Sequence, residues 1–381
     1  MKSRKLLFFI LACSIVLIGC NKEKIGYVDP EKNLTVNYAS VFDAFWNGVD
    51  RNYLYWDVDR DKVNWDEVRS RYAPLFAKLN INNKQDLIKG REYLSLMTKD
   101  LSDGHFRITF SSPLIEMDTI SPALVRFKSR AETTISDNIL YGKNLRDFLS
   151  EASLYTDPST NLRLLTGKIS SSSIYIHYNY CFLREGYQSN VNIKKIIDQF
   201  FTSAASSLVT TIVIDLRNNS GGDVSDLNFF IGSFFSDQTA FGYLKYKQGI
   251  NRLDYTPNLD AMVIPVKQIG LAQKKIIVIL NGRSASMAEI SALALSANPN
   301  TTIIGQQSFG ALGMIAFQRS LYNAGSFNVG EFMQVRMSSA SLSDKNRDNF
   351  EGKGILPAKN IKLVDTEKDN QLEYAIGMIG K

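Results

Sequence analysis

One serine of this chain stands where its hydroxyl could act as a nucleophile. The apolar run "KIIVIL" ends at Leu280, a short turn follows, and an alanine-rich helical pattern begins just after Ser286. Unpaired N–H groups and the positive end of the helix dipole favour negative charge at a helix N-terminus. Ser286 could therefore attack a carbonyl carbon while the N–H of Met287 helps to hold the oxyanion that forms.

The same residues also have the form of a helix cap. In "SMAE", Ser286 stands at the N-cap position and Glu289 follows three residues later, which is the pattern of a capping box. Caps far outnumber nucleophiles among serines at such positions. The two interpretations differ in consequence. Loss of a cap costs about 1 kcal/mol of stability, whereas loss of a nucleophile removes most of a rate enhancement.

Two further segments carry candidate groups. The buried strand "VTTIVIDL" leads into "RNNSGGDV", where Gly221 and Gly222 could supply a second oxyanion donor, although a tight turn would explain them equally well. The chain has only two histidines, so a histidine base must be His105 or His177. His177 lies on an alternating strand, and we interpret it as structural. His105 follows a glycine in "SDGHF", at a helix-to-strand junction where functional side chains are often presented; the alternative is a satisfied surface histidine.

These groups need elements to position them. The strand–helix–strand alternation of residues 171–381 predicts an α/β core with helices on both faces of a sheet. Residues 36–111 predict an N-terminal helical subdomain that ends in the Asp-Gly-His motif, with an aromatic stripe from Phe42 to Tyr53 that we expect to be buried. Residues 112–170 mix short strand-like runs with polar clusters, and we interpret them as a connecting region.

The N-terminus has the features of an export signal. "MKSRK" is basic, an apolar stretch follows, and "LIGC" ends at Cys20, which resembles a bacterial lipobox. We expect a lipoprotein signal peptide over 1–19, lipidation at Cys20 and a polar tether over 20–35. Asparagine at position 21 gives no signal for inner-membrane retention, so we expect attachment in the cell envelope at the outer membrane. The alternative is an ordinary signal peptide with an incidental cysteine.

The composition excludes some classes of protein. The chain has 381 residues, 44 of them Lys or Arg and 38 Asp or Glu, and removal of the three basic residues of the signal leaves 41 against 38. This balance gives no reason to expect a nucleic-acid partner. Cysteine and histidine are too scarce for a typical zinc site, and no phosphate-binding glycine loop with its lysine is present. We therefore expect neither a metal nor an organic cofactor.

Taken together, four motifs resemble those of the C-terminal-processing (tail-specific) serine protease family. They are, in order, "LSDGH", "IDLRNNSGGD", "SASMAEI" and "FEGKGILP", and "VFDAFWNGVDRNYLYWD" resembles the N-terminal segment of exported Bacteroidetes members. The resemblance implies a Clp-protease/crotonase-like twisted sheet core. Relatives often carry a PDZ domain after the histidine motif, and residues 106–172 are short for one, so we expect a reduced or absent PDZ domain.

One departure bears on the mechanism. Many relatives use a Ser–Lys dyad, but Ala311 stands in "SFGALG" where the lysine would be. The tricorn-core-like branch uses a histidine instead, and by that resemblance Ser286 is the nucleophile, His105 the general base and Glu351 the supporting carboxylate. The N–H groups of Met287 and of Gly221 or Gly222 would then form the oxyanion hole.

We therefore expect an exported, lipid-anchored serine peptidase that cuts peptides or unfolded proteins through an acyl-enzyme. The strongest alternative is a peptide-binding or scaffold lipoprotein that kept the fold but lost catalysis, as the missing lysine suggests. A second alternative, an esterase of the α/β-hydrolase type, is disfavoured because "GRSAS" is not the G-x-S-x-G elbow.

Overall fold

The structure of the protein, a computed structural model, describes residues 37–111, 119–129, 135–266, 269–315, 325–364 and 368–380. The expected signal peptide and tether, with Cys20, lie outside these ranges. None of the helices within them is long and apolar enough to cross a bilayer.

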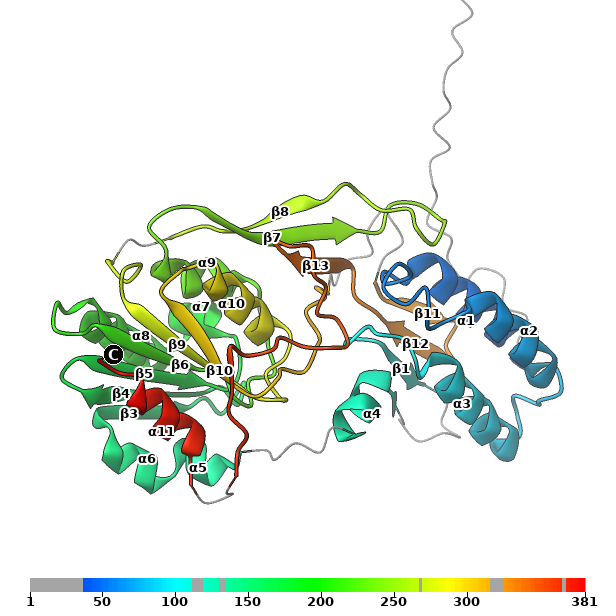
Figure 1. Cartoon of the computed structure of the whole chain (residues 1–381). Coiled ribbons are helices and arrows are strands. Elements are labelled where there is room, and N and C mark those ends of the chain that lie inside the picture. The colour runs from blue at the N-terminus through cyan, green and yellow to red at the C-terminus, as the bar shows by residue number, and fades with distance from the viewer. Residues whose placement is uncertain are drawn as a thin grey trace, which may run out of the picture.

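A seven-stranded sheet carries the carboxyl-terminal half of the chain, in the order β14-β10-β9-β6-β5-β4-β3 (Figure 1). The strands from β14 to β5 run parallel, and β4 and β3 are antiparallel to their neighbours. Parallel strands end at the same edge of a sheet, so the segments that follow β6 and β9 meet there. The strands are β3 (Ser150–Thr156), β4 (Arg163–Ser170), β5 (Ser173–Tyr178), β6 (Thr211–Asp215), β9 (Lys275–Leu280), β10 (Thr301–Gly305) and β14 (Lys359–Asn360).

Helices cover both faces of this sheet because successive side chains of its buried strands point to opposite faces. Along β9, Ile276 and Val278 pack into an apolar core with α8 and α10, and we call this cluster the serine-side core. Ile277 and Ile279 pack on the other face, against residues of α6 and α11. The helices are α5 (Asp137–Tyr141), α6 (Lys143–Phe148), α7 (Leu183–Ser189), α8 (Val191–Ala205), α9 (Ser225–Phe229), α10 (Met287–Ser296) and α11 (Asn370–Gly377), with the 3-10 helix η1 (Ile231–Phe234).

The N-terminal helices build a separate apolar core on a four-stranded sheet of order β11-β12-β1-β2. The predicted aromatic stripe from Phe42 to Tyr53 is buried in this cluster, which we call the histidine-side core. Two strands of the sheet come from far along the chain, so the N-terminal region does not close its core alone. The elements are α1 (Tyr38–Asn52), α2 (Trp65–Phe76), α3 (Lys84–Thr98), β1 (Arg107–Phe110), β2 (Thr119–Ile120), β11 (Phe327–Val329) and β12 (Met333–Arg336).

The segment that sequence analysis treated as a connecting region contributes regular structure. Within 112–170, helix α4 (Pro122–Ser129) is followed by α5 and α6, and then by β3 and β4, which extend the seven-stranded sheet. The alternation in β3 is weak because the strand is the sheet edge and mostly exposed. The sheet therefore begins earlier in the chain than the apolar strand signal at Ser173 indicates.

A third, three-stranded sheet crosses the molecule, in the order β13-β7-β8. Its strands are β7 (Thr239–Tyr246), β8 (Leu259–Val263) and β13 (Ala340–Asp344). Strands β7 and β8 form a long ribbon that reaches from the seven-stranded sheet toward the N-terminal helices (Figure 1). We call residues 239–263 the strap.

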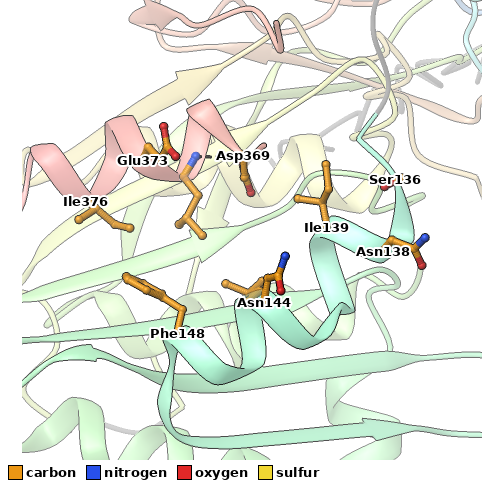
Figure 2. Close-up of a pocket in the computed structure, with 10 residues that line it drawn as sticks. Ser136, Asn138, Ile139, Asn144, Phe148, Asp369, Glu373 and Ile376 are labelled. Atoms are coloured by element: carbon orange, nitrogen blue, oxygen red, sulfur yellow. Dashed lines mark hydrogen bonds between the residues drawn. The ribbon is translucent and has the colours of Figure 1, made fainter. Parts of the chain in front are cut away.

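A cavity of about 570 Å³ lies between α11 and the helices α5 and α6. Figure 2 shows Ile376 of α11 facing Phe148 of α6 across this gap. None of the candidate catalytic residues lines it. The candidate site is therefore built elsewhere, at the edge where β6 and β9 end.

Candidate active site

Ser286 has a backbone conformation that an ordinary helix cap does not need. It directly precedes α10, with φ 55° and ψ −121°. N-cap residues normally adopt extended angles, and a non-glycine residue held at positive φ costs of order 1–3 kcal/mol and is typical of functional sites. Its N–H donates to the Glu289 carboxylate at 3.0 Å, which is the half of the capping box contributed by the glutamate.

The Ser286 hydroxyl lies against an imidazole. Its Oγ is 3.3 Å from Nε2 of His105, a residue 181 positions earlier in the chain. This distance is slightly longer than a typical hydrogen bond of about 2.6–3.2 Å, and such catalytic contacts commonly shorten when substrate binds. The structure thus brings together the two residues that the sequence nominated as nucleophile and base.

Strand pairing accounts for the position of His105 and identifies a residue that the sequence analysis missed. Strands β1 and β12 are antiparallel, with Arg107 opposite Arg336. The same register, continued two residues beyond the strand ends, places His105 opposite Ser338. Ser338 Oγ is indeed 3.4 Å from His105 Nδ1.

Ser338 connects the imidazole to a buried carboxylate. Its Oγ donates to Asp103 Oδ1 at 2.8 Å, and its N–H donates to Asp103 Oδ2 at 2.8 Å. Because the hydroxyl proton of Ser338 points to Asp103, its oxygen is free to accept from His105 Nδ1–H. This arrangement assigns the tautomer in which Nε2 has its lone pair directed at Ser286. The signal for Asp103 was its place in "SDGH", whereas "MSSAS" gave none for Ser338.

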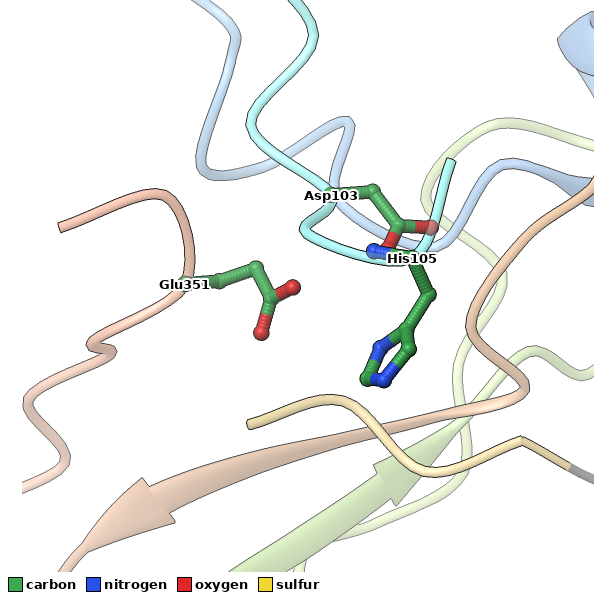
Figure 3. A group of neighbouring side chains, drawn as sticks. All are labelled: Asp103, His105 and Glu351. Atoms are coloured by element: carbon green, nitrogen blue, oxygen red, sulfur yellow. The ribbon is translucent and has the colours of Figure 1, made fainter. Parts of the chain in front are cut away.

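Glu351 supports the same loop but makes no hydrogen bond to the imidazole among the described residues. Its two oxygens accept from the N–H groups of Gly104 at 2.6 Å and Gly313 at 2.8 Å. Figure 3 shows Glu351 approaching, from a separate segment, the loop that carries Asp103 and His105; one ligand atom of each lies within 4.8 Å of the others. These side-chain types can bind metal ions, yet both carboxylates already accept hydrogen bonds from the protein.

The electrostatics of the site keep the imidazole neutral. Burial, with the nearby charges of Arg336 and Arg107, lowers the pKa of His105 to about 4. Burial raises the pKa of Asp103, against the hydrogen bonds it accepts. Burial and then the charge of Asp103 raise the pKa of Glu351 well above its usual range. At neutral pH, His105 is therefore unprotonated and able to accept a proton.

Within the described part of the chain, main-chain N–H groups without an acceptor occur at Met287, directly after Ser286, and at Gly222, directly after Gly221. The N–H of Gly221 instead donates to Asn219 Oδ1 at 2.9 Å. A Cβ on Gly221, where φ is 90°, would lie 2.6 Å from Ser286 Cβ. Gly221 is thus needed for close approach to the serine, and Gly222 is the glycine whose donor is free.

The position of the relatives' lysine is packed against the histidine loop. A Cβ on Gly104 would lie 2.4 Å from the Cβ of Ala311 and 2.6 Å from the carbonyl oxygen of Gly310. This close packing leaves no room for a side chain at 104. The hydroxyl beside His105 Nδ1 comes from Ser338, on a separate segment of the chain.

The other histidine has a different environment. His177 is fully buried on β5, with Nδ1 2.8 Å from the Asp215 carbonyl oxygen and Nε2 2.6 Å from the Tyr141 hydroxyl. Both ring nitrogens are occupied by the fold, in line with its interpretation as a structural residue.

Comparisons with known proteins give two family matches. Residues 175–361 match the model of Peptidase family S41, and residues 35–88 match that of the Tricorn protease C1 domain. No curated protein is similar enough in sequence to count as a relative.

Solved structures share the fold. The crystal structure of a candidate peptidase from Parabacteroides merdae is 19% identical and aligns over 90% of this chain and 96% of its own, with a TM-score of 0.67. That of mature CPAF is 9% identical and aligns over 86% of this chain and 92% of its own, with a TM-score of 0.55. The predicted fold class, a mixed α/β core of crotonase-like type with an N-terminal helical region, is confirmed.

Proposed function

We propose, because residues 175–361 match the model of Peptidase family S41, that the protein is a serine peptidase acting on peptides or unfolded proteins. The observation that carries the proposal is the 3.3 Å contact between Ser286 Oγ and His105 Nε2. The strained backbone of Ser286 supports it, because a residue that only capped a helix would relax to extended angles.

The chemistry follows that of a serine hydrolase. Ser286 Oγ attacks the scissile carbonyl carbon while its proton passes to His105 Nε2, and the N–H groups of Met287 and Gly222 stabilise the oxyanion. The tetrahedral intermediate collapses, the C–N bond breaks, and the leaving amine takes the proton from Nε2. Water then attacks the resulting ester, giving one proton to His105, which returns it to Ser286 as the acid product leaves.

In this scheme, the carboxylates act through the groups they hold. The imidazolium that forms during each step is stabilised by a chain of two hydrogen bonds. Nδ1–H donates to Ser338 Oγ, and the Ser338 hydroxyl donates to the Asp103 carboxylate. Glu351 fixes Gly104 and with it the loop that presents the imidazole. We therefore propose a Ser–His pair supported by Ser338 and Asp103, with Glu351 as a positioning carboxylate and not as the direct partner of His105.

Labelling by a fluorophosphonate tests the proposal and separates it from the inactive-binder alternative. We expect the native chain to be labelled at Ser286 and the Ser286→Ala variant to be unlabelled. A folded native chain that stays unlabelled between pH 5 and 9, while still binding a peptide, would favour the binder.

Ser338→Ala is expected to lower kcat with little change in KM. Hydrogen bonds to charged groups contribute about 1.5–3 kcal/mol, so loss of the contact to Nδ1 corresponds to roughly a 10- to 100-fold decrease in kcat. The neighbouring Ser339→Ala, which removes a bond to the Met314 carbonyl oxygen, serves as the control and should change kcat less than threefold. Equal effects in the two variants would refute the assignment.

The pH profile is expected to follow the depressed pKa of His105. Because only the neutral imidazole can accept the serine proton, kcat/KM should fall as the pH drops through about 4, and not near 6.5 where an ordinary histidine titrates. Arg336→Gln removes a nearby positive charge and should move this acid limb to higher pH.

Folding stability is expected to decline over a related range. The unfolded chain binds the histidine proton first, so the titration of His105 should decrease the free energy of unfolding as the pH falls from about 6.5 to 4. Asp103 and Glu351, whose pKa values are raised, contribute in the opposite direction, and His105→Gln isolates the histidine part. Samples returned from pH 4 to 7 and assayed again distinguish titration from denaturation. A reversible acid limb near 6.5 would contradict the expected environment of His105.

We also propose that the mature chain is exported and anchored in the cell envelope through a lipid on Cys20. The support is the sequence "LIGC" after a basic and apolar N-terminus. Mass spectrometry of the N-terminal peptide should find a diacylglyceryl group on Cys20, and Cys20→Ala should release the protein from membranes.

A further inference from the structure

Ser286 and His105 are attached to two different apolar cores. Met287, next to the serine, packs in the serine-side core, and Phe106, next to the histidine, packs in the histidine-side core. The 3.3 Å contact between the two side chains therefore spans the junction of the cores. Its length depends on how firmly one core is held against the other.

The strap contacts both cores. Near its root, Phe241, Ala261 and Val263 are buried in the serine-side core. At its far end, Tyr255 packs against the histidine-side core. A single ribbon thus connects the scaffold of the nucleophile to the scaffold of the base.

Arg252 makes the main polar contact at the far end of the strap. Its Nε lies 2.7 Å from Asp50 Oδ1, and its Nη1 and Nη2 lie 2.8 and 2.7 Å from the two oxygens of Asp66. Its guanidinium carbon is 5.3 Å from the ring centre of Trp56. Asp50 belongs to α1 and Asp66 to α2, so one side chain joins the strap to two N-terminal helices.

A second ion pair, and a hydrogen bond inside the turn, hold the far end of the strap in place. Lys245 pairs with Asp57, and the Tyr255 hydroxyl donates to the same carboxylate at 3.3 Å. Inside the turn, the buried Lys247 ammonium donates to the carbonyl oxygen of Gly249 at 3.3 Å. The turn that carries Arg252 is thus held in shape from within.

We propose that Arg252 is a positioning residue for catalysis: it latches the strap onto the N-terminal helices and so keeps His105 within reach of Ser286. The inference rests on the proposed function. Isolated surface ion pairs contribute little. This one is bidentate to Asp66 and shared with Asp50; the side chains of Arg252 and Asp50 are 30% and 22% exposed, and that of Asp66 is 68% exposed. Bidentate pairs of arginine with a carboxylate are the stronger ones.

Kinetics of Arg252→Ala test the latch. We expect kcat to fall about tenfold with KM changed less than twofold, because small displacements of reacting groups are costly. Arg252→Lys keeps the positive charge but cannot make the bidentate contact, so it should recover part of the rate. The matched control is Arg69→Ala, which removes an ion pair of 2.8 Å to Asp43 and a contact with Trp46 inside the N-terminal helices, without touching the strap.

Amide hydrogen exchange of residues 102–106 gives a readout that does not need activity. Exchange of the Gly104 N–H should be faster in Arg252→Ala than in native protein and unchanged in Arg69→Ala. If the native chain proves inactive, the proposed function fails, but the exchange rates still show whether Arg252 holds the histidine loop in place. Equal exchange and equal kinetics in the two alanine variants would overturn the inference.

Discussion

Ser286→Ala is expected to abolish hydrolysis of a fluorescein-labelled unfolded protein, with kcat/KM lower by about 10⁴–10⁶-fold. The reason is the loss of the hydroxyl oxygen that lies 3.3 Å from His105 Nε2. The measurement is the initial rate of fluorescence release at several substrate concentrations. Ser296→Ala, at the exposed end of the same helix, is the matched control and should keep native activity.

The unfolding free energies of variants at Ser286 distinguish a nucleophile from a helix cap. If Ser286 were mainly a cap, its replacement by alanine would cost about 1 kcal/mol of unfolding free energy. If the hydroxyl is held in a strained conformation for chemistry, alanine should be nearly neutral and Ser286→Gly should be about 1 kcal/mol more stable than Ser286→Ala, because glycine tolerates the positive φ. Urea unfolding of the three proteins decides the question. An alanine variant that is destabilised yet fully active would refute the nucleophile.

His105→Gln is expected to lower kcat/KM by about 10²–10⁴-fold, the range associated with loss of a general base. Glutamine is close in size and fills the space beside Ser286, so the fold should persist, but its amide cannot accept the serine proton. The rate of fluorophosphonate labelling should fall in parallel, since that reaction needs the same proton transfer. Circular dichroism establishes that the variant is folded.

His177→Gln is the matched comparison for the base. It replaces a buried histidine whose ring nitrogens are bound to Asp215 and Tyr141, so it should lower stability. The folded fraction should still label at Ser286. Loss of labelling in the folded His177 variant, with retention in the His105 variant, would reverse the two roles.

Local sequence signals nominated the residues of the candidate site that lie in motifs. Ser286 could be nominated because an apolar strand, a turn and the start of a helix follow one another within a few residues. Each of these has its own pattern in the sequence. Asp103 and His105 lay in one short motif at a change of period. Family resemblance supplied the crotonase-like class, which no periodicity identifies.

Contacts between residues far apart in the chain could not be predicted from the sequence in this way. Ser338 reaches His105 only because β1 and β12 pair in one register, and nothing in "MSSAS" specifies that register. Glu351 was expected as the supporting carboxylate of the site, and the sequence did not indicate that its oxygens would accept from the main-chain N–H groups of Gly104 and Gly313. A glutamate that accepts hydrogen bonds from main-chain N–H groups is the same residue type as one that contacts a histidine, so a sequence pattern cannot distinguish the two roles.

The two-core construction also has a consequence during biosynthesis. A ribosome delivers the proposed base first, the nucleophile 181 residues later, and Ser338 and Glu351 last of all. Because β12 must pair with β1 before the imidazole is oriented, an unfinished or truncated nascent polypeptide that ends before β12 has the serine but no assembled proton relay. Under the proposed function, hydrolytic competence would therefore arise only once synthesis is nearly finished.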